Sequence, residues 1–82
     1  MAHGVWTRYI GPTNHRPSRI RVTWGGASLV VPYDHGASGE SHRAAVRDAM
    51  ERWGETVLPA GIKYVTETES GRGSVFLVYV AG

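Results

Sequence analysis

The most regular alternation of apolar and polar residues lies over Arg19–Trp24. Ile20, Val22 and Trp24 occupy every second position there, and two arginines and a threonine stand between them. A period of two residues is typical of a β-strand with one buried face. We therefore predict a strand at Arg19–Trp24 with an apolar inner face and a cationic outer face.

Two further strands are predicted around it, over Val5–Ile10 and Ser28–Val31. The pair Gly25-Gly26 favours a tight reversal before the third strand, because glycine accepts the backbone angles of two-residue turns. Pro32 is expected to end that strand, because it lacks the N–H that a β-ladder needs. The three segments predict an antiparallel meander.

A helical spacing replaces the alternation further along the chain. Apolar residues recur at positions i, i+3, i+4 and i+7, namely at Val46, Ala49, Met50 and Trp53. This stripe predicts one amphipathic helix from about Glu40 to Trp53. Ser38 or Ser41 is expected to cap its first N–H groups, and Gly54 stands where a helix commonly ends in a left-handed residue.

The last third of the chain predicts two more strands, over Ile62–Glu69 and Ser74–Val80, joined by a glycine-containing turn. The second of these is apolar on both faces, which favours a central position in the sheet. We therefore predict a single α+β domain over residues 1–82, an antiparallel five-stranded sheet with one helix packed on one face in the order βββαββ. The predicted core is Ile10, Ile20, Val22, Leu29, Val31, Val46, Ala49, Met50, Trp53, Ile62, Tyr64, Val75, Leu77 and Tyr79.

The residue inventory narrows the possible chemistry. The chain contains no cysteine, which excludes disulfides and thiolate metal sites. It contains no apolar run of the roughly 18 residues that a membrane span needs, and its first residues do not form a signal-peptide pattern. We expect a cytoplasmic protein without a cofactor, as a monomer or a homodimer.

Four groups of residues are candidates for reactive sites, and none predicts catalysis or metal binding. Asp34, His35 and His42 offer zinc ligands, but the first two are adjacent and point apart in an ordinary loop. Ser41 with His42 and Asp48 lacks the turn of a serine nucleophile. Glu67 and Glu69 share a strand face without a predicted cleft. The glycines of residues 71–73 precede a strand, whereas a phosphate loop precedes a helix.

The charge distribution indicates two candidate binding surfaces. Residues 1–35 carry four arginines against one aspartate, a net charge of +3, whereas residues 36–82 carry five basic and six acidic groups, a net charge of −1. Arginine and tyrosine are favoured interface anchors. The basic candidate surface is Arg8, Tyr9, Arg16, Arg19, Arg21 and Tyr33. The acidic alternative is Glu51, Glu55, Glu67 and Glu69. A basic sheet with aromatic residues such as Trp6 is also typical of single-strand nucleic-acid binding.

Three segments carry a family resemblance. They are Tyr9-Ile10-Gly11-Pro12-Thr13-Asn14, Ser18-Arg19-Ile20 and Val31-Pro32-Tyr33-Asp34-His35, followed by His42-Arg43-Ala44-Ala45. The pattern resembles a group of short, mostly uncharacterised proteins of phages, prophages and plasmids, over residues 7–55. His15 and Pro17 depart from that pattern, Pro17 at a position where glycine is more usual.

The resemblance implies a function but supplies no catalytic residues. Small phage proteins of this kind often counter host defence, and compact anti-CRISPR proteins are similar in size and fold class. The resemblance thus implies a non-catalytic inhibitor that binds a subunit of a bacterial CRISPR effector complex and blocks DNA binding or assembly. The alternative is a small nucleic-acid-binding module of a phage or plasmid.

Overall fold

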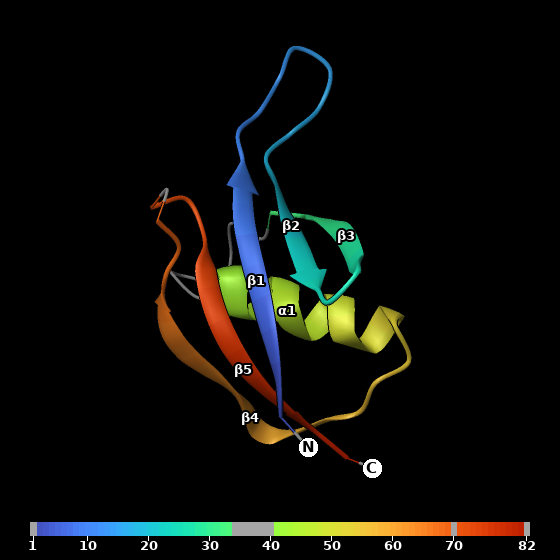
Figure 1. Ribbon diagram of the computed structural model, residues 1–82. Helices are drawn as coiled ribbons and strands as arrows, with labels where there is room; N and C mark the ends of the chain where they lie inside the picture. The colour runs from blue at the N-terminus through green and yellow to red at the C-terminus, as the bar shows by residue number, and fades with distance from the viewer. Residues whose placement is uncertain (1, 34–40, 70, 82) are drawn as a thin grey trace.

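Five antiparallel strands form one sheet in the computed structural model, which describes residues 2–33, 41–69 and 71–81. The spatial order of the strands is β3-β2-β1-β5-β4, and α1 lies across one face (Figure 1). The elements are β1 Ala2–Ile10, β2 Arg19–Trp24, β3 Ala27–Pro32, α1 Ser41–Arg52, β4 Val57–Glu67 and β5 Ser74–Val80. The predicted α+β class, element order and one-sided helix are confirmed.

The core lies between α1 and the sheet face that the helix covers. Ile20 and Val22 of β2 are fully buried there, as their alternation with arginines predicts. The buried positions of the helix follow the predicted stripe, and Gly54 ends the helix with a left-handed φ of 83°. The buried apolar residues are Val5, Ile20, Val22, Val31, Ala45, Val46, Ala49, Met50, Ile62, Phe76, Val78 and Val80.

Two strands present the opposite face to the helix from the one predicted. On β5 the buried residues are Phe76, Val78 and Val80, whereas Leu77 is 38% exposed. Because every residue of Val75–Val80 is apolar or aromatic, the sequence pattern could not select a face. On β1 the helix covers Val5 and Thr7, and this leaves Ile10 half-buried on the other side. The predicted core positions Ile10, Val75, Leu77 and Tyr79 were therefore wrong.

Strand β4 begins at Val57, five residues before the predicted start. The prediction treated Pro59 as part of a loop, but β4 is an edge strand, where a residue without an N–H is tolerated. The pairing shifts register between Val57 and Ile62, and Ala60 takes a positive φ of 54° inside this irregularity. Tyr64, predicted in the core, is 52% exposed at this edge and meets the Phe76 ring edge-on.

The connection from β1 to β2 projects beyond the end of the sheet (Figure 1). Its residues from Gly11 to Pro17 are all exposed, and its tip is closed by a hydrogen bond from the Thr13 N–H to the Arg16 carbonyl, with N and O 2.9 Å apart. The predicted turn chemistry of this segment therefore forms a protruding loop.

The start of β5 packs against β1 without room for a side chain. A Cβ added at Gly73 would lie 1.8 Å from the carbonyl oxygen of Thr7. The Tyr9 N–H donates to the carbonyl of the neighbouring Arg72, with N and O 2.7 Å apart. The glycine thereby lets the β4–β5 connection carry Arg72 to the end of β1.

Several sequence-based expectations concern residues outside the described ranges. Ser38, Glu40, Asp34 and His35 are among these, whereas Ser41, the other predicted cap, is the first residue of α1. Within the described ranges, no helix has the length and apolar character needed to cross a membrane.

Candidate macromolecule-binding face

The sheet has one face that α1 covers and one that carries no helix in the described part of the chain, which we call the helix-free face. Strand alternation assigns its side chains, and the strand pairing fixes which of them are neighbours. The residues of the helix-free face that concern function are Gly4, Trp6, Arg8, Arg19, Arg21, Lys63, Leu77 and Tyr79.

Arg8 and Arg21 form a pair of like charges at the centre of this arrangement. They stand directly opposite one another on β1 and β2, and both side chains are exposed. Like charges at directly opposed positions of two strands are destabilising, whereas opposite charges contribute roughly 0.2–1 kcal/mol. Within the described residues, neither guanidinium group has a carboxylate within ion-pair distance. Among the described residues, the fold therefore holds two cations side by side without a carboxylate partner.

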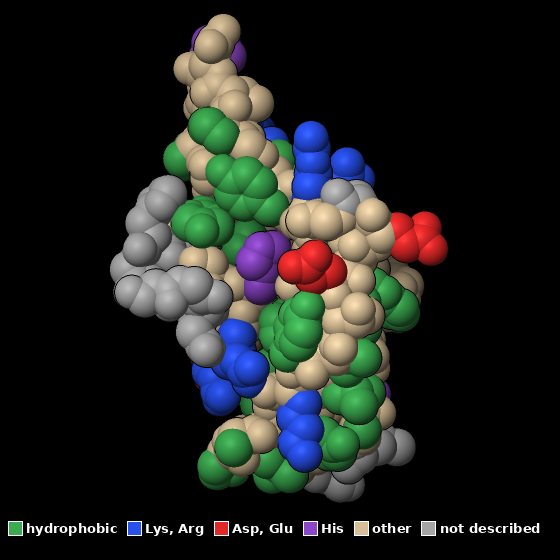
Figure 2. All heavy atoms as spheres, turned by 90° about the vertical axis from the view of Figure 1, so that its left-hand side faces the viewer, with side chains coloured by type: hydrophobic (Ala, Val, Ile, Leu, Met, Phe, Trp, Pro, Cys, Tyr) green, Lys and Arg blue, Asp and Glu red, His purple; other side chains and the backbone are tan. Residues whose placement is uncertain are grey.

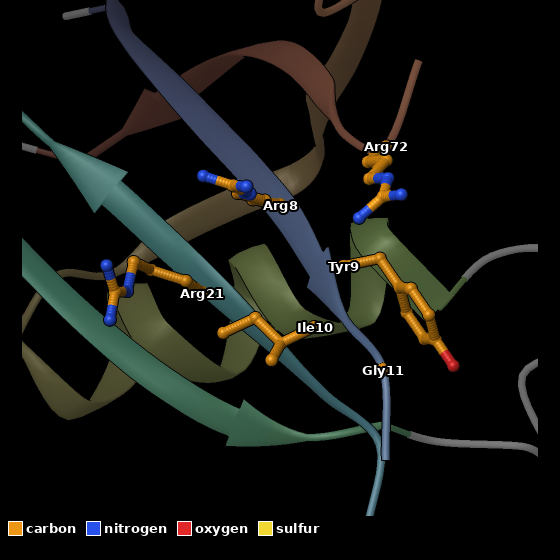
Figure 3. Close-up of a pocket in the computed structure, with 6 residues that line it drawn as sticks. All are labelled: Arg8, Tyr9, Ile10, Gly11, Arg21 and Arg72. Carbon is orange, nitrogen blue, oxygen red and sulfur yellow. The ribbon is translucent and has the colours of Figure 1, made fainter. Parts of the chain in front are cut away.

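A third arginine joins this pair at the end of the sheet. Arg8, Arg21 and Arg72 line an open groove of about 260 Å³, together with Tyr9, Ile10 and Gly11 (Figure 3). Figure 3 shows Arg8 and Arg21 on neighbouring strands and Arg72 entering from the segment before β5. Three guanidinium groups around one groove suit an anion, because each offers planar N–H donors to phosphate or carboxylate oxygens.

Carboxylates are placed elsewhere on the described part of the molecule. Asp48 and Glu51 project from α1, and Glu55 follows that helix. Glu67 lines a groove on the helix side, and Glu69 lies in the β4–β5 connection. Among the described strand residues, the helix-free face thus carries cations and no anion.

Trp6 lies two residues before Arg8 and projects from the same face of the central strand. Its side chain is 48% exposed, and no other ring and no cation of the described residues packs against the indole. The next position on this face is Gly4, where an added Cβ would meet no atom within 4 Å. The indole therefore has open space beside it, above the backbone of Gly4.

The basic and aromatic character continues toward the other edge of the sheet. Leu77 lies opposite Gly4, and Lys63 lies opposite Leu77 on β4. The Lys63 Nζ atom is 5.5 Å from the centre of the Tyr79 ring, a cation–π contact. Across the face from β2 to β4, the central arginine pair is thus followed by Trp6 and Leu77 and then by Lys63 in contact with Tyr79.

The predicted basic surface divides between the two sides of the sheet. Tyr9 and Tyr33 lie on the helix side, where their rings meet edge-on with centroids 5.4 Å apart. The Tyr9 hydroxyl also hydrogen-bonds the Ser18 hydroxyl at 2.9 Å. Because Tyr9 follows Arg8 in a strand, the two side chains point to opposite faces. Tyr33 is therefore absent from the surface of the central arginines, and Tyr9 only borders their groove while its ring packs against Tyr33 on the helix side.

The other two predicted arginines differ in their availability. Arg16 is exposed in the protruding loop, where its backbone N–H donates to the Thr13 hydroxyl at 3.1 Å. Arg19 is half-buried on the helix-free face, and its Nη1 donates to the carbonyl of Pro17 at 3.4 Å. Arg19 therefore stands beside the central pair, while Arg16 lies out along the loop.

The acidic alternative is not gathered into one surface. Glu51 lines a shallow groove on the outer side of α1 with Arg43, Arg47 and Asp48. Glu67 lies in a different groove, near the first turn of that helix. Because a helix rises about 1.5 Å per residue, the two ends of α1 are about 16.5 Å apart. The acidic residues therefore lie in separate places, whereas Arg8, Arg19 and Arg21 of the basic set are neighbours on one face.

A polar cluster on the helix side was missed by the sequence-based reasoning. The Nδ1 atom of His42 lies 2.7 Å from the Thr7 hydroxyl, which accepts a hydrogen bond from the Ser74 N–H at 2.9 Å. The three residues come from α1, β1 and β5, so only their register reveals the contact. Burial lowers the pKa of His42 below its usual 6.5, because desolvation disfavours the charged imidazole.

His42 also borders a groove of about 420 Å³ with Tyr9, Tyr33 and Glu67. Figure 2, which views the molecule from the β4 side, shows a histidine at the surface between apolar side chains and an acidic one. Among the described residues, no three histidine or carboxylate side chains converge as metal ligands. The clearest role of His42 is to join the helix to β1 through Thr7.

Comparisons with known proteins give no significant match, whether to protein-family models, to curated proteins or to solved structures.

Proposed function

We propose that this chain is a non-catalytic binding protein of a mobile element that inhibits a bacterial defence complex, such as a CRISPR effector, and that the helix-free face is its docking surface. The class of target comes from the sequence resemblance. The choice of surface comes from the charges on the sheet. A protein of this kind would act by blocking DNA binding by the complex or its assembly.

The observation that carries the choice of surface is the opposed pair Arg8 and Arg21. A fold that needed this position only for stability would gain from an opposite charge or an apolar pair there. Two exposed cations without carboxylate partners among the described residues instead favour an anionic partner, because binding would supply the missing charges. Arg72 adds a third guanidinium group to the lining of the groove.

The proposal is tested by binding to purified effector complexes immobilised on a sensor surface. The double variant Arg8→Gln/Arg21→Gln is expected to bind at least about tenfold more weakly than the parent, since interface arginines often contribute more than about 1 kcal/mol each. The matched control is Arg47→Gln/Arg52→Gln, which removes the same charge from the exposed side of α1.

The control variant is expected to keep the parental affinity. An equal decrease of affinity in both double variants would mean that only net charge matters, and this would contradict the assignment of the surface. Failure of the parent protein to bind any of the complexes would count against the inhibitor function itself.

A further inference from the structure

We infer that the helix-free face binds single-stranded nucleic acid, with a base stacked on Trp6 and the adjacent phosphates held by Arg8 and Arg21. This inference rests on the proposed function in one respect, the use of the helix-free face as the contact surface. It names the partner of that face as the nucleic acid that a defence complex handles, in preference to an acidic protein surface.

The stacking part of the inference depends on the surroundings of Trp6. The indole is about half exposed on the central strand, flanked across the strands by the small side chains of Thr23 and Val75. Gly4, beside the indole, carries no side chain, and the space above its backbone is open. Aromatic side chains that stand on a sheet in this way provide stacking platforms for unpaired bases.

The phosphate part depends on the spacing along β1 and across to β2. Trp6 and Arg8 are two residues apart, which places them about 6.8 Å from one another along the strand. Arg21 stands directly opposite Arg8, so two guanidinium groups lie to one side of the indole. A nucleotide with its base on Trp6 can therefore place its phosphate toward both arginines.

The chemistry of the whole face favours a polyanion over an acidic patch on a folded protein. Its cations continue on both sides of Trp6, with Arg19 beyond Arg21 and Lys63 at the opposite edge. Tyr79, in cation–π contact with Lys63, offers a second ring on this face. Rings and cations exposed on one face suit the bases and the phosphates of a flexible strand.

A duplex fits this face less well than a single strand. In a duplex the bases are stacked on one another, so none is free to cover Trp6 without being unstacked. The major groove of B-DNA admits a helix or a two-stranded ribbon, whereas this sheet has five strands. Preference for single strands is therefore part of the inference.

The inference is tested by fluorescence anisotropy with a labelled oligothymidine of about 12 nucleotides, which is within the site size of known single-strand binders. The same sequence as a duplex serves as the comparison ligand. We expect the parent protein to bind the single strand more tightly than the duplex, and to bind more weakly as the salt is raised from about 50 to about 200 mM.

Three variants separate stacking from charge. Trp6→Leu is expected to weaken single-strand binding by about 5- to 150-fold, with the salt dependence unchanged. Arg8→Gln/Arg21→Gln is expected to lower the slope of log K against log salt by about 0.7 for each phosphate that the variant no longer neutralises. Gly4→Val places a side chain in the open space beside Trp6 without changing any charge. It is expected to weaken single-strand binding while the strand remains intact.

The outcomes distinguish this inference from the proposed function. If the oligonucleotide does not bind at about 50 mM salt, but the effector complex binds in a manner that needs Arg8 and Arg21, the partner is an acidic protein surface and the inference is overturned. Equal binding of duplex and single strand, or unchanged affinity in both Trp6→Leu and Gly4→Val, would also overturn it. If neither ligand binds, both proposals fail.

Discussion

The two faces of the sheet differ in what their side chains contribute to the molecule. The covered face packs its apolar residues against α1, and its hydroxyl at Thr7 is tied to His42 and Ser74. The helix-free face holds Trp6 exposed and sets Arg8 against Arg21 without a described counter-charge. The first face therefore satisfies its polar groups within the molecule, whereas the second leaves its indole and its two central guanidinium groups exposed.

Strand β1 makes this comparison within a single segment. Thr7 is 2% exposed and its hydroxyl hydrogen-bonds both His42 and Ser74, while the flanking Trp6 and Arg8 are exposed. Because successive residues of a strand point to opposite faces, a residue that packs against the helix and a residue that is exposed on the helix-free face are adjacent in sequence. A change at either face can thus be tested against a neighbour in the same strand.

Truncation of matched isoleucines should give the largest difference between the faces. Ile20→Ala on the covered face is expected to lower the free energy of unfolding by about 2–5 kcal/mol, because it opens a cavity in a fully buried site. Ile10→Ala on the helix-free face, where the side chain is half-buried, should cost less than half of that. Urea unfolding followed by circular dichroism measures both values.

Equal costs at the two isoleucines would contradict the division into a packed face and an open face. In that case the helix-free face would contribute as much burial as the covered face, for example within a homodimer. Repeating the urea titration at several protein concentrations would detect this, because the stability of a dimer rises with protein concentration.

Acid should lower the free energy of unfolding through a residue on the covered face, His42. Because burial lowers the pKa of His42 in the folded chain, the unfolded chain takes up the proton first as the pH falls. Stability is therefore expected to fall below about pH 6.5, by less than about 1.4 kcal/mol per pH unit, since His42 is only partly buried. Among the described residues that line the same groove, Glu67 and Arg72 are the charged neighbours of His42.

His42→Asn separates the titration from the hydrogen bond. Its amide can still hydrogen-bond the Thr7 hydroxyl but cannot be protonated in this range. The variant is expected to show a smaller decline in stability than the parent between about pH 6.5 and pH 5, measured by urea unfolding at each pH. An unchanged decline would assign the acid sensitivity to other groups and remove His42 from this role.

The covered face was predictable from sequence only where polar residues marked the opposite side. Arg19 and Arg21 mark the outer face of β2, so Ile20 and Val22 were placed correctly. Strand β5 carries no such markers, and its burial follows instead from pairing with β1, where Val5 lies opposite Phe76. Alternation gives the strand, but partner strands decide the face when both sides are apolar.

The sequence likewise predicted some residues of the candidate site but not their arrangement. Arg8 and Arg21 could be named from charge alone, but their direct opposition depends on the length of the loop between them. The contribution of Arg72 depends on Gly73, which brings its segment against β1. Tyr9 was placed with the arginines because of its residue type, although its position next to Arg8 already directs it to the other face.

The smallest expected effect provides the sharpest test of why the helix-free face is cationic. Arg21→Glu would replace a like-charge pair by an opposite-charge pair with Arg8, and should raise the free energy of unfolding by roughly 0.2–1 kcal/mol. The same variant should bind an anionic partner more weakly, because one guanidinium group becomes a carboxylate. Urea unfolding and oligonucleotide anisotropy on one preparation measure both effects.

Adding Arg8→Glu restores like charges and should cancel the gain in stability without recovering binding. Lower stability in Arg21→Glu would mean that Arg21 makes a stabilising contact of its own, and the pair would then give no reason to assign function to this face.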